Sequence, residues 1–96
     1  MNVFIQSAEF AAWMRKLRNI GAKARILSRL DCAALGNFGD CEPIGEGVLE
    51  MRIHLGPGYR IYYTRRGAEL YLLLAGGDKG TQKRDVRKAL EMARQL

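Results

Sequence analysis

The sequence predicts an α+β fold in which a small antiparallel sheet is flanked by helices. Two stretches within the first 35 residues repeat apolar side chains at helical spacing. In residues 48–75 the apolar side chains instead alternate with polar ones or form a continuous run, as in strands. In residues 81–96 the apolar side chains are again at helical spacing. A chain of 96 residues has room for one domain of ordinary size, so we expect a single domain spanning residues 1–96.

The first third of the chain predicts a short strand and two helices. Val3–Ile5 is rich in β-prone residues, and Ser7 offers a side-chain oxygen as the N-cap of a helix over Ala8–Arg18. A second helix follows from Ile20 to about Leu35. The glycine-rich stretch Gly36–Gly47 predicts a loop. The buried stripe of the first helix consists of Phe10, Trp13, Met14 and Leu17.

A β-hairpin is predicted from residue 48 onward. Val48–Leu55 and Tyr59–Thr64 both alternate apolar and polar side chains, and Gly56-Pro57-Gly58 separates them. Paired residues must share a face of the sheet, and a three-residue loop at positions 56–58 meets that condition.

This predicted register has a consequence for the polar face of the hairpin. It sets His54 opposite Arg60 and Arg52 opposite Tyr62, on the side away from the main core. We expect Arg60 to be largely solvated there. Glu50 lies on the same face and is expected to orient Arg52.

The remaining elements are a central strand and a C-terminal helix that covers the second face of the sheet. Glu69–Ala75 is almost continuously apolar, as in a strand that is buried on both sides. Within residues 81–96 an apolar stripe packs on the sheet, and the other faces of the helix are basic. The residues that we expect to bind RNA there are Lys83, Arg84, Arg87 and Lys88.

Charge and composition limit the kinds of function that the protein can have. The net charge of +6 belongs entirely to the second half, since residues 52–96 contain ten basic and four acidic side chains. An acidic stretch containing Asp40, Glu42, Glu46 and Glu50 precedes it. The charge favours a polyanionic partner. No apolar run is long enough to cross a membrane, and nothing marks a secretory signal, so we expect a cytoplasmic protein.

The basic half contains the parts for RNA cleavage without a metal ion. Such cleavage needs groups that transfer protons and cations around the developing phosphorane. His54 or Tyr62 would transfer protons, while Arg52, Arg60 and Lys79 would surround the charge. The stretch from Gly76 to Thr81 is either a phosphate-binding loop or a plain strand-to-helix turn. One histidine and two unclustered cysteines make a metal site improbable, and no cofactor is expected.

Two segments resemble the RelE/ParE toxin superfamily, closest to the addiction-module killer proteins related to HigB toxins. They are the run from Gly47 to Tyr63 and the run Leu72-Leu73-Leu74-Ala75-Gly76-Gly77-Asp78-Lys79 with Thr81-Gln82. The resemblance implies a RelE-like fold, with two N-terminal helices on one face of a small antiparallel sheet. It also implies a type II toxin that is held inactive by an antitoxin, commonly one with a helix-turn-helix domain.

The resemblance leaves more than one activity open. RelE-type and HigB-type members cleave mRNA on the ribosome, and Arg52, His54 and Arg60 fall where that branch carries basic residues. ParE-type members inhibit DNA gyrase instead. This chain has no tyrosine or histidine after Tyr71, where several ribonuclease members use one. The expected function is therefore a ribosome-dependent mRNA endoribonuclease. The alternatives are a ParE-like gyrase inhibitor and an inactive RNA-binding relative.

Overall fold

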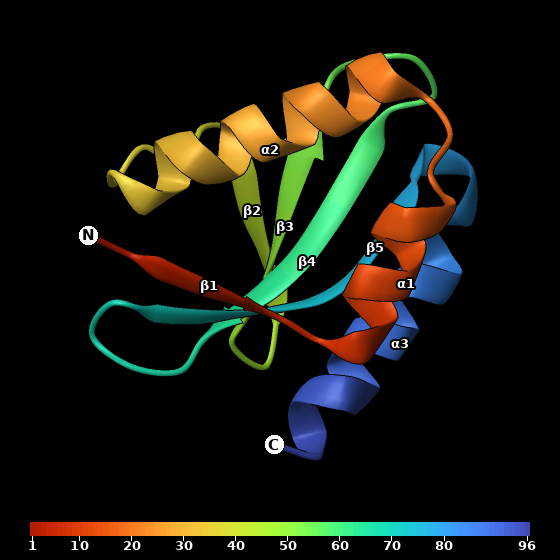
Figure 1. Cartoon of the computed structure of the whole chain (residues 1–96). Coiled ribbons are helices and arrows are strands. Elements are labelled where there is room, and N and C mark those ends of the chain that lie inside the picture. The colour runs from red at the N-terminus through yellow and green to blue at the C-terminus, as the bar shows by residue number, and fades with distance from the viewer.

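The computed structural model describes residues 1–96 and has the predicted α+β fold, with one five-stranded sheet between helices (Figure 1). The strand order in the sheet is β1-β5-β4-β3-β2. In chain order the elements are β1 (Val3–Gln6), α1 (Ala8–Lys16), α2 (Ile20–Ala34), β2 (Cys41–Gly45), β3 (Val48–Ile53), β4 (Tyr59–Arg65), β5 (Leu70–Asp78), the 3-10 turn η1 (Lys79–Thr81) and α3 (Gln82–Arg94).

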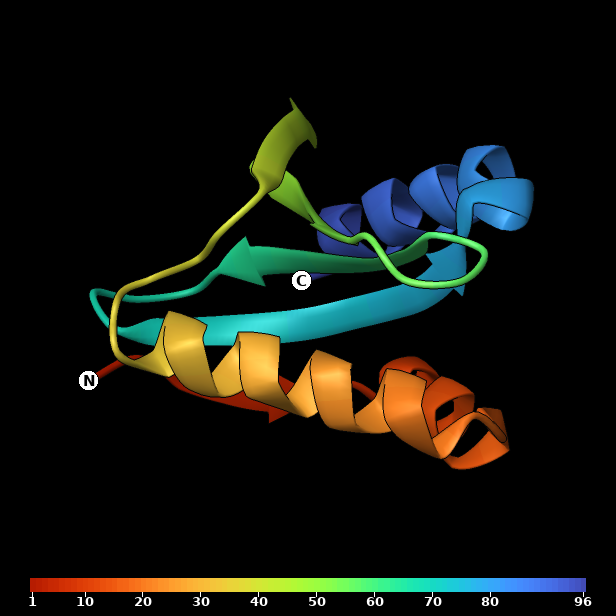
Figure 2. The ribbon, with the colours of Figure 1, turned by 90° about the horizontal axis from the view of Figure 1, so that it is seen from above.

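The larger core lies between the sheet and the two N-terminal helices, as the sequence predicts. Figure 2 shows α2 and α3 on opposite sides of the sheet. The odd-numbered hairpin residues face α1 and α2, so the predicted face of each strand is confirmed. The buried members of this core are Phe10, Ala22, Ile26, Ala33, Met51, Ile53, Tyr59, Ile61, Tyr63 and Leu73.

A smaller core lies under α3 on the other face of the sheet. Ala89 of α3 packs there on Val48 of β3, Tyr62 of β4, and Leu74 and Ala75 of β5. This confirms that the C-terminal helix covers the second face of the central strand. No helix of the protein combines the length and apolar character that crossing a membrane requires.

The sheet is mixed, whereas the sequence predicts an antiparallel one. β1 pairs with β5 in parallel, from Val3 opposite Leu70 to Gln6 opposite Leu73, while the other three pairs are antiparallel. Ser7 fixes this edge strand where it enters α1. Its hydroxyl donates to the carbonyl of Leu74 at 2.7 Å and accepts the amide of Phe10 as the predicted N-cap.

Strand β2 corrects the prediction of a loop over Gly36–Gly47. Cys41–Gly45 pairs antiparallel with β3 at the edge of the sheet. Pro43 is tolerated because an edge strand leaves one row of backbone groups unpaired. Glu46 and Gly47 take positive φ angles of 53° and 79° and turn the chain into β3. Of the four glycines in this stretch, Gly47 forms the turn and Gly45 follows an irregularity in the pairing with β3, while Gly36 and Gly39 precede the strand.

The hairpin register also differs from the prediction, by two residues, since Arg52 was expected opposite Tyr62. Arg52 lies opposite Arg60 and Ile53 opposite Tyr59, so the loop contains residues 54–58 and not 56–58. The ladder ends early because the chain turns at Ile53, whose carbonyl accepts the amide of Leu55 at 2.9 Å. Both registers keep the same faces, so the parity of the sequence could not separate them.

Candidate functional site

The β3–β4 turn and the connection from β5 to α3 meet at one end of the sheet. Arg60 of β4 lies between its partners, opposite Arg52 of β3 and opposite Gly77 of β5. The backbone amide of Lys79 donates to the carbonyl of Pro57 in the hairpin turn at 3.4 Å. Four of the five predicted catalytic residues lie at this end of the sheet: Arg52, His54, Arg60 and Lys79.

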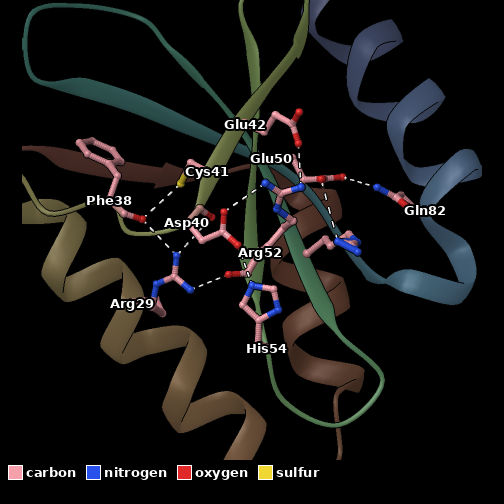
Figure 3. A network of polar contacts seen from close by, with 10 residues as sticks. Arg29, Phe38, Asp40, Cys41, Glu42, Glu50, Arg52, His54 and Gln82 are labelled. Atoms are coloured by element: carbon pink, nitrogen blue, oxygen red, sulfur yellow. Dashed lines mark hydrogen bonds and ion pairs between the residues drawn. The ribbon is translucent and has the colours of Figure 1, made fainter.

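Arg52 is held by two carboxylates that β2 and the residue before it supply (Figure 3). Its Nη2 lies 3.1 Å from Oδ1 of Asp40, and its Nη1 lies 2.7 Å from Oε2 of Glu42. The hydrogen bond to Asp40 is the main cause of a raised pKa of Arg52. Arg52 is not oriented by Glu50, as expected from the sequence, because pairing with β2 brings Asp40 and Glu42 closer.

His54 lies in the turn and contacts an acid, not a base. Its Nε2 is 2.6 Å from Oδ2 of Asp40, and 74% of its side chain is exposed. The predicted pairing of His54 with Arg60 is wrong because the longer loop leaves His54 outside the ladder. Hydrogen bonds from His54 first and Arg52 second hold the pKa of Asp40 below its usual value.

Arg29 of α2 fixes the backbone around these side chains. Its Nη1 donates to the carbonyl of Arg52 at 2.6 Å, and its Nη2 donates to the carbonyl of Phe38 at 3.1 Å. The amide of Arg52 donates to the carbonyl of Asp40 at 2.9 Å. Sequence reasoning missed Arg29 and Asp40 as parts of the site, and its only signal for Asp40 was the acidic stretch before β3.

A second polar network surrounds the buried carboxylate of Glu50, which is 2% exposed. The hydroxyl of Tyr62 donates to Oε2 of Glu50 at 2.9 Å, and Nε2 of Gln82 donates to the same oxygen at 3.0 Å. Nη1 of Arg60 lies 4.0 Å from Oε1 of Glu50. Glu50 therefore joins β3, β4 and the start of α3.

Burial changes the roles that Tyr62 and Arg60 can have. Tyr62 is fully buried, and burial, followed by its hydrogen bond to Glu50, raises the pKa of its hydroxyl far above the usual value. Arg60 was expected to be solvated, yet only 13% of its side chain is exposed. Both side chains are buried because α3 covers this face of the hairpin. The hydroxyl of Tyr62 is therefore out of contact with solvent.

The predicted phosphate-binding stretch from Gly76 to Thr81 is not an open loop. Gly76 and Gly77 belong to β5, where an added Cβ would collide with Trp13 and Asp85, so glycine permits this close approach. Oδ1 of Asp78 accepts the amides of Gly80 at 2.8 Å and Thr81 at 3.2 Å. These amides are already capped within the protein, as in a plain strand-to-helix turn.

The basic start of α3 forms an open hollow of about 420 Å³ that no apolar side chain lines. Lys79 and three of the predicted RNA-binding residues, Lys83, Arg84 and Arg87, line it. Lys88 instead borders a separate hollow of about 490 Å³ between α1 and α3, beside Trp13. The hollow at the start of α3 is thus a concentrated cationic surface. No group of three or more His, Cys, Asp or Glu side chains could hold a metal ion.

Known proteins are similar to this one over nearly the whole length of the chain. The sequence model of the family described as "Phage derived protein Gp49-like (DUF891)" matches residues 9–96. The chain is similar to a protein of Haemophilus influenzae that carries only the description "Uncharacterized protein". The two are 42% identical over 87 residues, which cover 91% of this chain and 88% of that protein. The chain therefore belongs to the Gp49-like family of phage-derived proteins, a toxin-like family of the addiction-module kind.

Proposed function

We propose that this protein is the toxin of a type II toxin–antitoxin system and cleaves mRNA on the ribosome without a metal ion. The observation that carries the proposal is the meeting of Arg52, Arg60 and Lys79 at one end of the sheet, next to the cationic start of α3. Membership in a toxin-like family supports the toxin role. The resemblance to RelE/ParE toxins suggests the reaction.

The reaction we assign uses the ribose next to the cleaved bond. The 2′-hydroxyl loses its proton and attacks the adjacent phosphorus, the bond from phosphorus to the 5′-oxygen breaks, and that oxygen takes a proton. His54 is the proton-transfer group in this proposal because it is exposed in the hairpin turn. Tyr62 has no place in it, since its hydroxyl is buried on Glu50. Arg52, Arg60 and Lys79 stabilise the phosphorane charge.

The cationic start of α3 is the proposed RNA-binding surface. Lys83, Arg84 and Arg87 line one hollow together with Lys79. An RNA strand whose phosphates bind there would extend toward the hairpin turn. Lys88 extends the surface toward α1.

The proposed partners are a cognate antitoxin, commonly of the helix-turn-helix type, and the ribosome with its mRNA in the cytoplasm. An acidic or amphipathic antitoxin segment that covers Arg52, Arg60 and Lys79 would inhibit the toxin directly. A complex that contacts only α1 and α2, and leaves the hairpin end open and active, would contradict this mode of inhibition.

A ParE-like inhibitor of DNA gyrase is the second candidate, and the burial of Tyr62 favours it. No tyrosine or histidine follows Tyr71, so His54 is the only accessible side chain of the predicted pair that could transfer a proton. An inactive RNA-binding relative fits the same observation.

Induction of the protein in a bacterium, followed by primer extension across a translated message, tests these candidates. We expect cuts in phase with codons, and Lys79→Ala should lower the cleavage rate about a hundredfold by removing one charge contact in the transition state. Arg25→Ala removes an exposed cation from α2, on the opposite face of the sheet, and serves as the control. Intact mRNA with damaged DNA would replace the first candidate with the second.

A further inference from the structure

We propose that Arg52 and His54 form an anion site which the carboxylates of Asp40 and Glu42 occupy in the free protein, and that a phosphodiester group of RNA displaces them. The choice of RNA as the displacing ligand rests on the proposed function. The site itself rests on the contacts of these four side chains, which Figure 3 shows together.

The Asp40 carboxylate bridges the side chains of Arg52 and His54 as a phosphate would. Its Oδ1 accepts from Nη2 of Arg52 at 3.1 Å, and its Oδ2 lies 2.6 Å from Nε2 of His54. Two non-bridging oxygens of a phosphodiester can take the same two partners. Glu42 occupies the remaining terminal nitrogen, Nη1 of Arg52, at 2.7 Å. Each terminal nitrogen of Arg52 thus already donates one hydrogen bond to a carboxylate, and a phosphate that takes the same position must displace that carboxylate.

The occupying groups can move, while the site that they occupy is fixed. The side chains of Asp40 and Glu42 are 41% and 56% exposed, and such surface ion pairs contribute little to stability. The backbone of Arg52 is anchored by Arg29, which also holds the carbonyl of Phe38. Rotation of two exposed carboxylate side chains would therefore open the site without rearranging the fold.

The cations at this end are not saturated by acceptors of the protein. Arg52 and Arg60 lie opposite each other in the hairpin, and the Nε atoms of both are buried without a hydrogen-bond partner. A buried unpaired N–H is unfavourable. Asp40, Glu42 and Glu50 therefore leave one donor of each guanidinium group, its Nε, without an acceptor.

The carboxylates make the site selective for a polyanion. A lone phosphate must compete with two negative groups that are already in place. An RNA strand is also bound by the hollow that Lys79, Lys83 and Arg87 line, which raises the local concentration of its next phosphate at the site. RNA should therefore displace the carboxylates at concentrations at which inorganic phosphate does not.

Fluorescence anisotropy with a labelled 2′-O-methyl oligoribonucleotide tests the inference. This probe lacks the attacking hydroxyl, so binding is measured without cleavage or ribosomes. We expect Asp40→Asn to tighten binding about fivefold, the change that corresponds to freeing one surface ion pair. Glu42→Gln, which leaves Asp40 in place, should also tighten binding of the probe. Adding Arg52→Gln to Asp40→Asn should abolish the gain.

Glu46→Gln is the matched control because it removes the same charge from an ion pair with Arg94, in the turn that precedes β3. We expect it to change binding by less than about twofold, because Glu46 pairs with Arg94 and with neither Arg52 nor His54. The proposal is overturned if Asp40→Asn and Glu42→Gln bind the probe as Glu46→Gln does, or more weakly. It is also overturned if no variant binds the probe. Loss of ribosome-dependent cleavage with the gain in binding intact would refute only the proposed enzymatic activity.

Discussion

Glu50 is a buried carboxylate that three neighbours from different elements surround. Tyr62 and Gln82 donate hydrogen bonds to one oxygen, and Arg60 lies 4.0 Å from the other. A carboxylate that is 2% exposed needs such partners because burial of an unpaired charge is strongly unfavourable. Arg60, which lies at the proposed catalytic end, thus also stabilises the fold through Glu50.

For this reason we expect Arg60→Ala to lower the free energy of unfolding by about 2 kcal/mol, since it leaves a buried charge without its cation. Chemical denaturation measures the change. Arg60→Ala combined with Glu50→Gln should recover part of the loss because the uncompensated charge is gone. Arg94→Ala, which removes an arginine from an exposed ion pair, should leave stability nearly unchanged. A fully stable Arg60→Ala would mean that Arg60 does not stabilise Glu50.

The buried tyrosines predict how stability responds to alkali. Burial first, then hydrogen bonding to Glu50 and Cys41 respectively, raises the pKa of Tyr62 and Tyr63 well above the unfolded value of 10.0. Above about pH 10 the unfolded chain loses these protons and the folded chain keeps them, so the stability contribution present below pH 10 decreases as pH rises. Denaturation across pH 9–12, with tyrosinate absorbance, measures this. Tyrosinate from both residues in the folded protein would contradict it.

At the scale of elements, the predictable features are those that follow from periodicity. The parity of the hairpin put Ile53 and Ile61 in the larger core and Tyr62 on the other face, as observed. Loop length was not predictable, since loops of three and five residues preserve the same faces. Strand β2 was not predictable because an edge strand tolerates the proline and glycines that usually indicate a loop.

The candidate site was predictable to the same extent. The gathering of Arg52, Arg60 and Lys79 follows from adjacent strands that end together. The contacts of Asp40 depend on β2, and the burial of Arg60 depends on where α3 lies. Both are long-range consequences that local spacing does not contain.

Two isoleucines test the packing of these elements. Ile61 of β4 is fully buried, so Ile61→Ala should cost roughly 2–5 kcal/mol of stability through lost burial and a cavity. Ile20 at the start of α2 is 82% exposed, so Ile20→Ala should change stability by less than about 0.5 kcal/mol. Thermal or urea melts compare the two variants. Equal losses would show that the register of β4 against the N-terminal helices is wrong.

The whole molecule separates its charge from its larger apolar core. Helices α2 and α3 lie on opposite sides of the sheet (Figure 2). The cationic hollow lies at the start of α3. Four of the basic side chains therefore lie together on one surface.

A surface of this kind should bind RNA with a strong dependence on salt. Four cations, Lys79, Lys83, Arg84 and Arg87, line the hollow, and neutralising one phosphate each would give a slope of log K against log salt of about −3 for a single strand. Arg87→Gln should reduce the magnitude of the slope by about 0.7. Arg25→Gln, on the far side of the sheet, should leave it unchanged. Binding to ribosomes or to RNA across a salt series measures both. A flat response in the unmodified protein would argue against phosphate contacts and for an apolar protein target, because counterion release accompanies every phosphate that a cation neutralises.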